Sequence, residues 1–207
     1  MKIKFILITI MFLLFSCNAQ DKDNIKKQDG LNNKKNIKMG IAKFDIETFE
    51  KNKIDGEYYF TLPDGTKVQQ LSSKVDYGEI ITPPKPNFFI TSKQYYKTGI
   101  LQSVIVSFPK SFLVLKRSYN NKGEFIEEID YNEPFKFSFK QLVELLKKEK
   151  DTIDLYDVST TIGRGSDEKG TDWYVTYKKI WGRREVIKID GITGKILERS
   201  SYVHLDN

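Results

Sequence analysis

From residue 57 onward, the sequence is a series of short runs rich in aromatic and β-branched residues, each closed by a turn signal. The run at 57–62 is followed by Pro63-Asp64-Gly65, in which proline presets φ and glycine accepts a positive φ, and residues 67–71 supply a return strand. Prolines within 81–86 then interrupt the pattern, because proline lacks the N–H that a strand ladder requires. Short strands joined by tight turns predict an antiparallel sheet.

Two further strand–turn–strand units follow between residues 95 and 131. Residues 95–108 contain the first and residues 119–131 the second, and their turn glycines, Gly99 and Gly123, lie 24 positions apart. The recurrence resembles the MORN-type hairpin repeats of some bacterial antitoxin-like proteins. Because a stable repeat array needs about three copies or more, the sequence favours a plain β-meander.

The longest helical signal covers residues 138–150, and a weaker one covers 44–50. Ser138 is a suitable N-cap, with Gln141 three positions on in the capping-box arrangement. An apolar stripe lies within 142–146, and lysines toward the end suit the negative pole of the helix. Alternating apolar residues then predict three strands, at 153–162, 172–179 and 184–190.

The chain next turns through the sequence DGITGKIL at 190–197. This ending, after a helix and three strands, resembles the PepSY family, whose members typically end in an aspartate, two residues, Thr-Gly, a variable residue and two aliphatic residues. The resemblance covers residues 137–199 and implies an α-β-β-β unit that binds or restrains a partner without catalytic residues. Local chemistry favours a structural turn, in which Asp190 accepts backbone N–H bonds, Thr193 caps with its hydroxyl and Gly194 takes a positive φ.

The N-terminus has the pattern of an export signal. Basic residues at 2 and 4 precede an apolar run at 5–15, which is too short to span a bilayer but has the length of a signal core. The sequence LFSC at 14–17 resembles the lipobox of bacterial lipoproteins, although Phe15 replaces the usual small or aliphatic residue. The resemblance implies a signal peptide at 1–16, cleavage after Ser16 and lipidation of Cys17, whose two or three acyl chains anchor stably. An ordinary cleaved signal with an incidental Cys17 is the alternative.

Polar residues dominate 18–39, which with Cys17 form the predicted flexible tether at 17–39. The leader and this tether also hold most of the net charge of +6, so that residues 40–207 carry about +1. A nucleic-acid interface requires clustered Lys and Arg on the folded part, so we expect no nucleic-acid partner.

The scarcity of reactive side chains argues against catalysis. The chain has one cysteine, Cys17, and one histidine, His204, which leaves no internal disulfide and almost no route to histidine-based metal sites or nucleophile activation. The glycine-rich segment 163–170 lacks the Gly-Lys-Ser/Thr ending of a phosphate loop and is expected to connect two strands. Glu127 and Glu128 are adjacent in a strand and therefore point to opposite faces. We predict no enzyme activity, cofactor or metal; a hydrolase acting through carboxylates alone is a third, less favoured class.

Residues 180–184, with the sequence IWGRR, are expected to form the tip of a hairpin. A tryptophan followed closely by two arginines has the composition of an interaction hot spot, which makes Trp181, Arg183 and Arg184 the candidate partner contacts. In the alternative interpretation, Trp181 folds back onto the sheet edge and the arginines are merely solvated.

Together these patterns predict an α+β fold: antiparallel sheet, one major helix at 138–150, a β-rich part at 40–136 and the PepSY-like part at 137–207. The sequence leaves open whether the two β parts form one sheet or two domains. The predicted function is a membrane-anchored envelope lipoprotein that binds a protein without catalysis. One version is an immunity or inhibitor protein against a toxin or protease; the alternative is a structural or assembly lipoprotein of a secretion or transport machine. Its membrane contact is the lipid anchor, with the outer membrane of a Gram-negative bacterium as the expected location.

Overall fold

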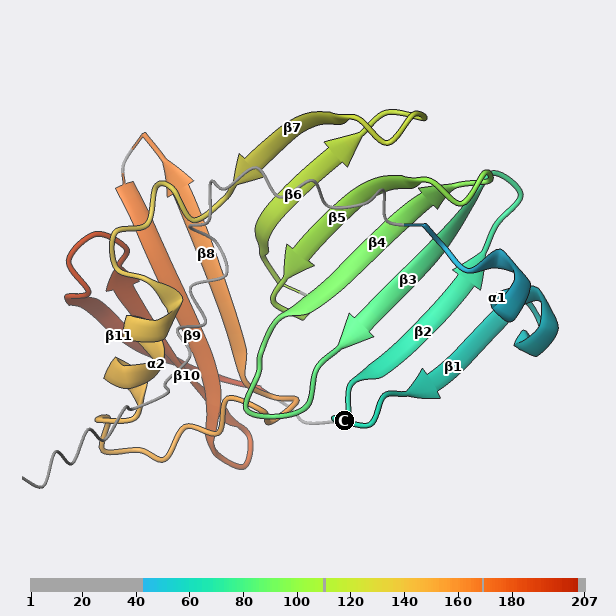
Figure 1. The fold of residues 1–207 in the computed structure, drawn as a ribbon. Coiled ribbons are helices and arrows are strands. Elements are labelled where there is room, and N and C mark those ends of the chain that lie inside the picture. Colours follow the sequence, from blue (N-terminus) through green and yellow to red (C-terminus); the bar gives the residue numbers. More distant parts are fainter. Residues whose placement is uncertain (1–42, 110, 169, 205–207) are drawn as a thin grey trace, which may run out of the picture. The chain divides into compact units, whose positions relative to one another are not determined.

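A computed structural model describes residues 43–109, 111–168 and 170–204 (Figure 1). The predicted signal peptide, Cys17 and the tether lie outside the described residues. Within the described part, no helix is long and apolar enough to cross a membrane.

The first half of the described chain forms a seven-stranded antiparallel sheet (Figure 1). Its spatial order equals its sequence order, β1-β2-β3-β4-β5-β6-β7, so it is a meander, as predicted. The prolines at 83, 84 and 86 interrupt the strand pattern as predicted, because β3 ends at Thr82, directly before them. The strands are β1 (Glu57–Thr61), β2 (Lys67–Ser72), β3 (Asp76–Thr82), β4 (Ile90–Tyr96), β5 (Leu101–Ser107), β6 (Leu113–Tyr119) and β7 (Phe125–Asp130).

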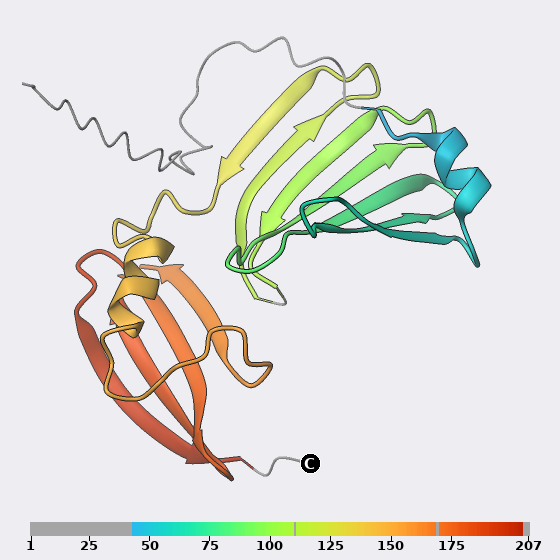
Figure 2. The same ribbon diagram turned by 60° about the horizontal axis from the view of Figure 1, so that its bottom comes forward.

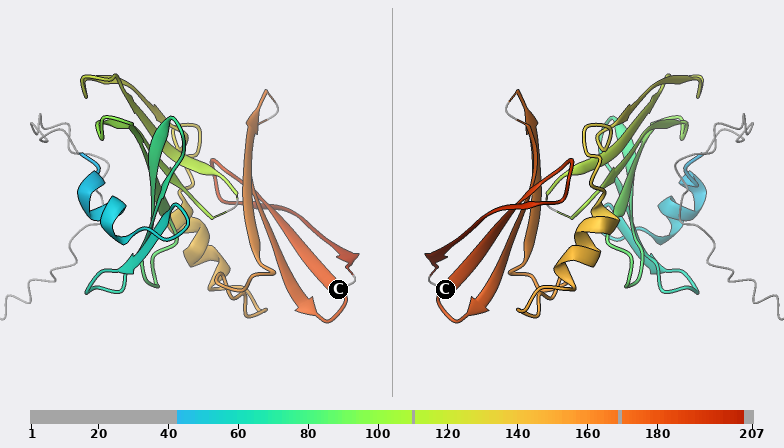
Figure 3. Two further views of the ribbon diagram at one scale, coloured as in Figure 1. Left: turned by 90° about the vertical axis from the view of Figure 1, so that its right-hand side faces the viewer. Right: turned by 90° about the vertical axis from the view of Figure 1, so that its left-hand side faces the viewer.

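A short helix, α1 (Ile46–Asn52), covers one end of this sheet on one face (Figure 3). Asp45 caps it by accepting a hydrogen bond from the Thr48 backbone N–H at 3.0 Å. The Phe44 ring stacks on Tyr77 with the ring centroids 4.7 Å apart, and Phe49 packs edge-on against both rings. This aromatic cluster packs the helix against the sheet.

The main helix, α2 (Phe139–Leu146), is shorter than the predicted 138–150. Its start is as expected: Ser138 and Gln141 form the full capping box. The apolar stripe ends at Leu146, and beyond it Lys148 and Glu149 donate their N–H groups to carbonyls only three residues back, which tightens and ends the helix. Lysines after Leu146 add no buried surface, so nothing holds a further helical turn on the sheet.

Four strands follow the helix rather than three, and they form a separate antiparallel sheet ordered β11-β10-β9-β8 (Figure 2). They are β8 (Thr161–Asp167), β9 (Gly170–Ile180), β10 (Arg183–Asp190) and β11 (Ile196–Val203). The question of one sheet or two, which the sequence left open, is thus decided: the described β parts form two sheets. The α-β-β-β order is also incomplete, because residues 196–203 pair along β10 as a full strand.

The predicted strand at 153–162 is wrong for most of its length. Asp154 and Asp157 each accept a hydrogen bond from the backbone N–H two residues on, which folds the segment into consecutive turns. Conversely, residues 163–167 are not a loop connection: β8 runs through them, paired with β9. Pairing along β9 and burial of Ile162 outweigh the low strand preference of Gly163 and Gly165.

One apolar core contains residues from both sheets and from α2. Trp173 lies at its centre with no exposed surface, in ring contact with Phe112, Phe135 and Phe139. The predicted inward faces are confirmed: Trp173, Val175 and Tyr177 of β9 and Ile187 and Ile189 of β10 are all buried. Leu142 and Leu146 of α2 pack into the same cluster, so α2 lies on one face of the four-stranded sheet (Figure 2).

Candidate protein-interaction site

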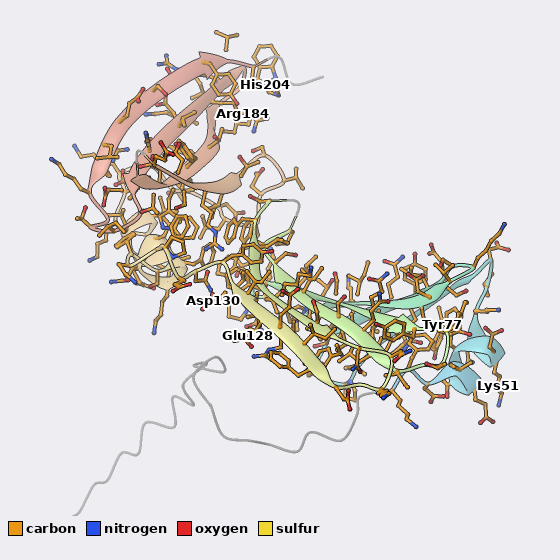
Figure 4. All side chains as sticks on the ribbon, turned by 90° about the horizontal axis from the view of Figure 1, so that it is seen from above. Lys51, Tyr77, Glu128, Asp130, Arg184 and His204 are labelled. Carbon is orange, nitrogen blue, oxygen red and sulfur yellow. The ribbon has the colours of Figure 1, made fainter. Side chains whose placement is uncertain are left out.

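The hairpin that joins β9 to β10 has a two-residue loop, Trp181-Gly182. Gly182 has a φ of 73°, a left-handed conformation that glycine adopts without steric cost. The end of β11 lies beside this loop, because the His204 backbone N–H donates to the Gly182 carbonyl at 3.0 Å. Arg184 and His204 accordingly lie at the same end of the four-stranded sheet (Figure 4).

Apolar side chains gather around this loop and remain in solvent. Trp181 is 75% exposed, so it does not fold back onto the sheet edge. Ile180 is 60% exposed and Val203 is 79% exposed, and both are register partners of Arg183. Tyr202, the partner of Arg184, is 48% exposed. Tyr202 and Val203 are adjacent in β11, so Tyr202 points to the opposite face from Val203. We call Ile180, Trp181, Arg183 and Val203 the tip surface.

The two arginines differ in availability. Arg183 remains half-exposed at its side chain, 3.3 Å from Glu185, and donates to the Ser201 hydroxyl at 2.6 Å. Arg184 is partly buried and donates to the Ser159 carbonyl at 2.7 Å, which ties the turn segment before β8 to the hairpin. Of the two predicted contacts, Arg183 belongs to the exposed surface, and Arg184 also holds the hairpin to its neighbour.

Tyr202 and Val203 were not among the predicted contacts, and Ile180 was placed in the predicted hairpin but not named as a contact. Residues 198–203 lack a clear alternation of apolar and polar side chains, so the sequence analysis predicted no fourth strand there. Their position beside Trp181 follows only from the pairing of β10 with β11. The one signal in the sequence is the run of Tyr202, Val203 and His204 near the C-terminus.

Asp190, Thr193 and Gly194 form a turn between β10 and β11. The Asp190 carboxylate accepts hydrogen bonds from the Thr193 N–H at 2.6 Å, the Ile192 N–H at 3.0 Å and the Thr193 hydroxyl at 2.8 Å. The bond from the Thr193 N–H is the main reason that the pKa of Asp190 lies below its ordinary value. Gly194 has a φ of 74°.

This turn also supports the core. The Phe137 N–H donates to the Gly191 carbonyl at 2.9 Å, and the Phe137 carbonyl accepts from the Trp173 indole at 2.9 Å. A side chain at Gly194 would place its Cβ 2.3 Å from the Phe137 ring. The three motif residues thus act locally, by holding the segment that leads into α2.

A second notable group, absent from the sequence analysis, surrounds Arg164 of β8. Its guanidinium lies 4.6 Å from the ring centroid of Phe112, 4.7 Å from that of Phe135 and 5.5 Å from that of Trp173. It also donates to Asn132 at 2.7 Å and to the Leu113 carbonyl. Burial lowers the pKa of Arg164 to about 10, partly opposed by Asp130, so the group is cationic at neutral pH.

A shallow pocket of about 360 Å³ opens beside Arg164. Since the guanidinium is already bonded to Asn132 and Leu113 and covered by rings, we assign Arg164 to the joining of the two sheets. Among residues 43–109, 111–168 and 170–204, no three or more His, Cys, Asp or Glu side chains are grouped so that they could hold a metal ion.

Comparison with protein-family models, with curated proteins and with solved structures found no match to the chain. Within the described residues, the tip surface is the place where an exposed tryptophan, further apolar groups and a cation meet.

Proposed function

We propose that this chain is a lipid-anchored envelope protein that binds a protein partner through the tip surface and performs no catalysis. The observation that carries the proposal is the contrast between the two tryptophans: Trp173 is fully buried, whereas Trp181 is 75% exposed. Exposing an indole to water is unfavourable, and large exposed aromatic groups beside arginine are typical of interaction hot spots.

The surroundings of Trp181 support this use. Ile180 and Val203 supply apolar surface on either side of the strand that carries Arg183. Because Arg183 keeps about half of its side chain in solvent, its guanidinium has donors to offer a carboxylate or carbonyl of a partner. The sheet holds these groups on three paired strands, β9, β10 and β11, and on the loop between the first two, so little order must be gained on binding.

The proposed anchor is Cys17, and the proposed tether at 17–39 would let the folded part meet its partner away from the membrane. Here the lipobox resemblance and the PepSY resemblance support the proposal. The narrower form of the proposal is an immunity or inhibitor protein that captures a toxin or protease.

The test compares partner capture by the wild-type chain and by Trp181→Ala, using envelope extracts and mass spectrometry. Removing a hot-spot tryptophan costs about 2 kcal/mol or more, which corresponds to roughly 30-fold weaker binding. Phe125→Ala is the matched control, because Phe125 is a 59% exposed aromatic residue on β7, in the other sheet. Equal capture by wild type and Trp181→Ala, or equal loss in both variants, would contradict the assignment of the tip surface.

Fluorescence gives an independent reading of the same event. Trp173 is shielded in the core and supplies a constant background, so a shift of the emission to shorter wavelength on adding a purified partner reports on Trp181. A partner that binds without this shift contacts another surface.

A further inference from the structure

Exposed apolar side chains of the seven-stranded sheet gather at one end. The turns that lead into β1, β3, β5 and β7 all lie at this end, because the sheet is an antiparallel meander (Figure 1). In the described part of this sheet and its turns, four of the five most exposed large apolar side chains lie here: Ile54 at 78%, Val75 at 75%, and Phe125 and Ile126 at 59% each. The fifth, Tyr59, lies in the middle of β1. We call the end that carries Ile54 and Val75 the entry end.

Ile54 and Val75 project from neighbouring turns with fixed backbones. Ile54 and Glu57 exchange two backbone N–H···O bonds, at 2.8 and 3.0 Å, around a tight two-residue turn. In the second turn, the Ser73 hydroxyl accepts a hydrogen bond from the Val75 N–H at 3.1 Å. The two turns are neighbours, because Glu57 at the start of β1 pairs with Leu71 near the end of β2. The fold thus holds both aliphatic side chains in water.

A lysine precedes each of these aliphatic residues: Lys53 precedes Ile54, and Lys74 precedes Val75. A lysine stem can lie along an apolar surface while its ammonium group stays in the polar layer, which suits the boundary of a lipid bilayer. Lysine is depleted in protein–protein interfaces, which favour tryptophan and arginine. The entry end therefore differs in chemistry from the tip surface and fits a lipid surface better than a protein.

The charge of the entry end indicates how it would bind lipid. Residues 43–57 contain three lysines and five acidic residues, so they carry no positive excess that could attract anionic headgroups. Apolar contact must then supply the affinity, which makes the binding insensitive to salt.

The chain also enters the described fold at this end. The Phe44 N–H donates to the Gly99 carbonyl at 2.8 Å, and Lys43 forms a β-bridge with Ile100; both partners lie at the turn between β4 and β5. Residues 18–42 connect this point to Cys17, and a coil of 25 residues has an end-to-end distance of about 25–30 Å. A lipid on Cys17 would therefore hold the entry end close to the bilayer, where even a weak contact is occupied.

We infer that the entry end docks on the phospholipid bilayer that holds the lipidated Cys17. Ile54 and Val75 enter the boundary between headgroups and acyl chains, and Lys53 and Lys74 remain at the level of the headgroups. The inference rests on the lipid anchor of the proposed function and adds a second, reversible membrane contact made by the folded part.

Site-directed fluorescence in protein-free vesicles tests this docking. The lipidated chain is reconstituted at a low protein-to-lipid ratio in vesicles of phosphatidylethanolamine and phosphatidylglycerol. Cys17 is the one natural cysteine, and acylation blocks its thiol, so an environment-sensitive dye reacts only with an introduced cysteine. Val75→Cys carries the probe. Val158→Cys is the matched control, because Val158 is a fully exposed valine in the segment between α2 and β8.

Lipids with a nitroxide on the acyl chain should quench the dye of Val75→Cys at least about threefold more than the dye of Val158→Cys. Adding Ile54→Asp to Val75→Cys should shift the docking equilibrium about tenfold toward the free state and reduce the quenching to the level of the control. The quenching of Val75→Cys should persist at high salt. Unchanged Trp173 emission in each variant checks the fold.

Four results would overturn the docking: equal quenching at the two positions, quenching that survives Ile54→Asp, quenching lost at high salt, or quenching lost when the protein is diluted in more lipid, which would assign the contact to a second copy. Dye uptake by the wild-type chain would show a free Cys17 thiol and overturn the anchor together with the docking. An acylated Val75→Cys chain without quenching overturns the docking alone. Partner capture from extracts is read separately through Trp181.

Discussion

Gly194 and Gly182 share a backbone conformation but not an environment. Their φ values are 74° and 73°, yet a Cβ on Gly194 would lie 2.3 Å from the Phe137 ring, whereas a Cβ on Gly182 would meet no atom within 4 Å. Comparing Gly194→Ala with Gly182→Ala therefore isolates the effect of the Phe137 contact.

The magnitudes follow from these two environments. A left-handed φ costs alanine about 1–2 kcal/mol, and the reduced freedom of the unfolded chain returns about 0.4–1 kcal/mol, so Gly182→Ala should lower the free energy of unfolding by about 1 kcal/mol. Gly194→Ala carries the same cost and must also displace the Phe137 ring, which adds roughly 1–3 kcal/mol for overpacking. We expect a total near 3 kcal/mol for Gly194→Ala.

Urea denaturation followed by Trp fluorescence measures both variants. The Trp173 indole donates to the Phe137 carbonyl, so its emission is sensitive to the displaced segment. Thermal midpoints should fall by roughly 2–4 °C for Gly182→Ala and 6–12 °C for Gly194→Ala. Equal destabilisation of the two variants would refute the role of Gly194 in seating Phe137.

Three further predictions concern the cap, the turn and the sheet junction. Ser138→Ala removes the capping hydroxyl of α2 and should lower the free energy of unfolding by about 1 kcal/mol in chemical denaturation; an unchanged midpoint would contradict the capping role. Because Asp190 has a pKa below its unfolded value of 3.8, its contribution to stability is present above that pH and is lost as the pH falls through its folded pKa. Asp190→Asn should therefore reduce the loss of stability as the pH falls below about 4, and an acid unfolding profile parallel to that of the wild type would exclude Asp190 as its source. Arg164→Lys loses the planar fork that contacts Asn132 and the Leu113 carbonyl and should cost about 1–3 kcal/mol of stability, whereas Arg183→Lys, on the exposed surface, should cost less than about 0.5 kcal/mol.

Features whose causes are local were predictable. The Pro63-Asp64-Gly65 turn, the capping box at Ser138 and the turn bonds of Asp190 each depend on residues within about five positions of one another. Alternation of apolar residues likewise placed Trp173 and Ile187 in the core, because a strand with one buried face needs that period.

Features that depend on distant pairing were not predictable. Gly163 and Gly165 have low strand preference, and they are in a strand because β9 supplies a partner for each. The Asp154 and Asp157 carboxylates accept hydrogen bonds from backbone N–H groups two residues on, and the resulting turns keep this segment out of the sheet. The apolar residues of the segment had favoured a strand. In both places a tertiary or side-chain hydrogen bond outweighed the local preference.

The sequence by itself determined the antiparallel meander, the cap and start of α2, the hairpin at Trp181 and the expectation of a lipid anchor at Cys17, because each depends on short-range geometry or on a contiguous motif. Tertiary structure alone decided that the chain forms two sheets around one core, that Arg184 is tied to Ser159, and that Tyr202 and Val203 lie beside Trp181. The physical reason is that these features join residues far apart in the chain, such as Arg183 with Val203 and Arg184 with Ser159. Which partners meet depends on the surfaces that remain to be buried once every strand has found a neighbour.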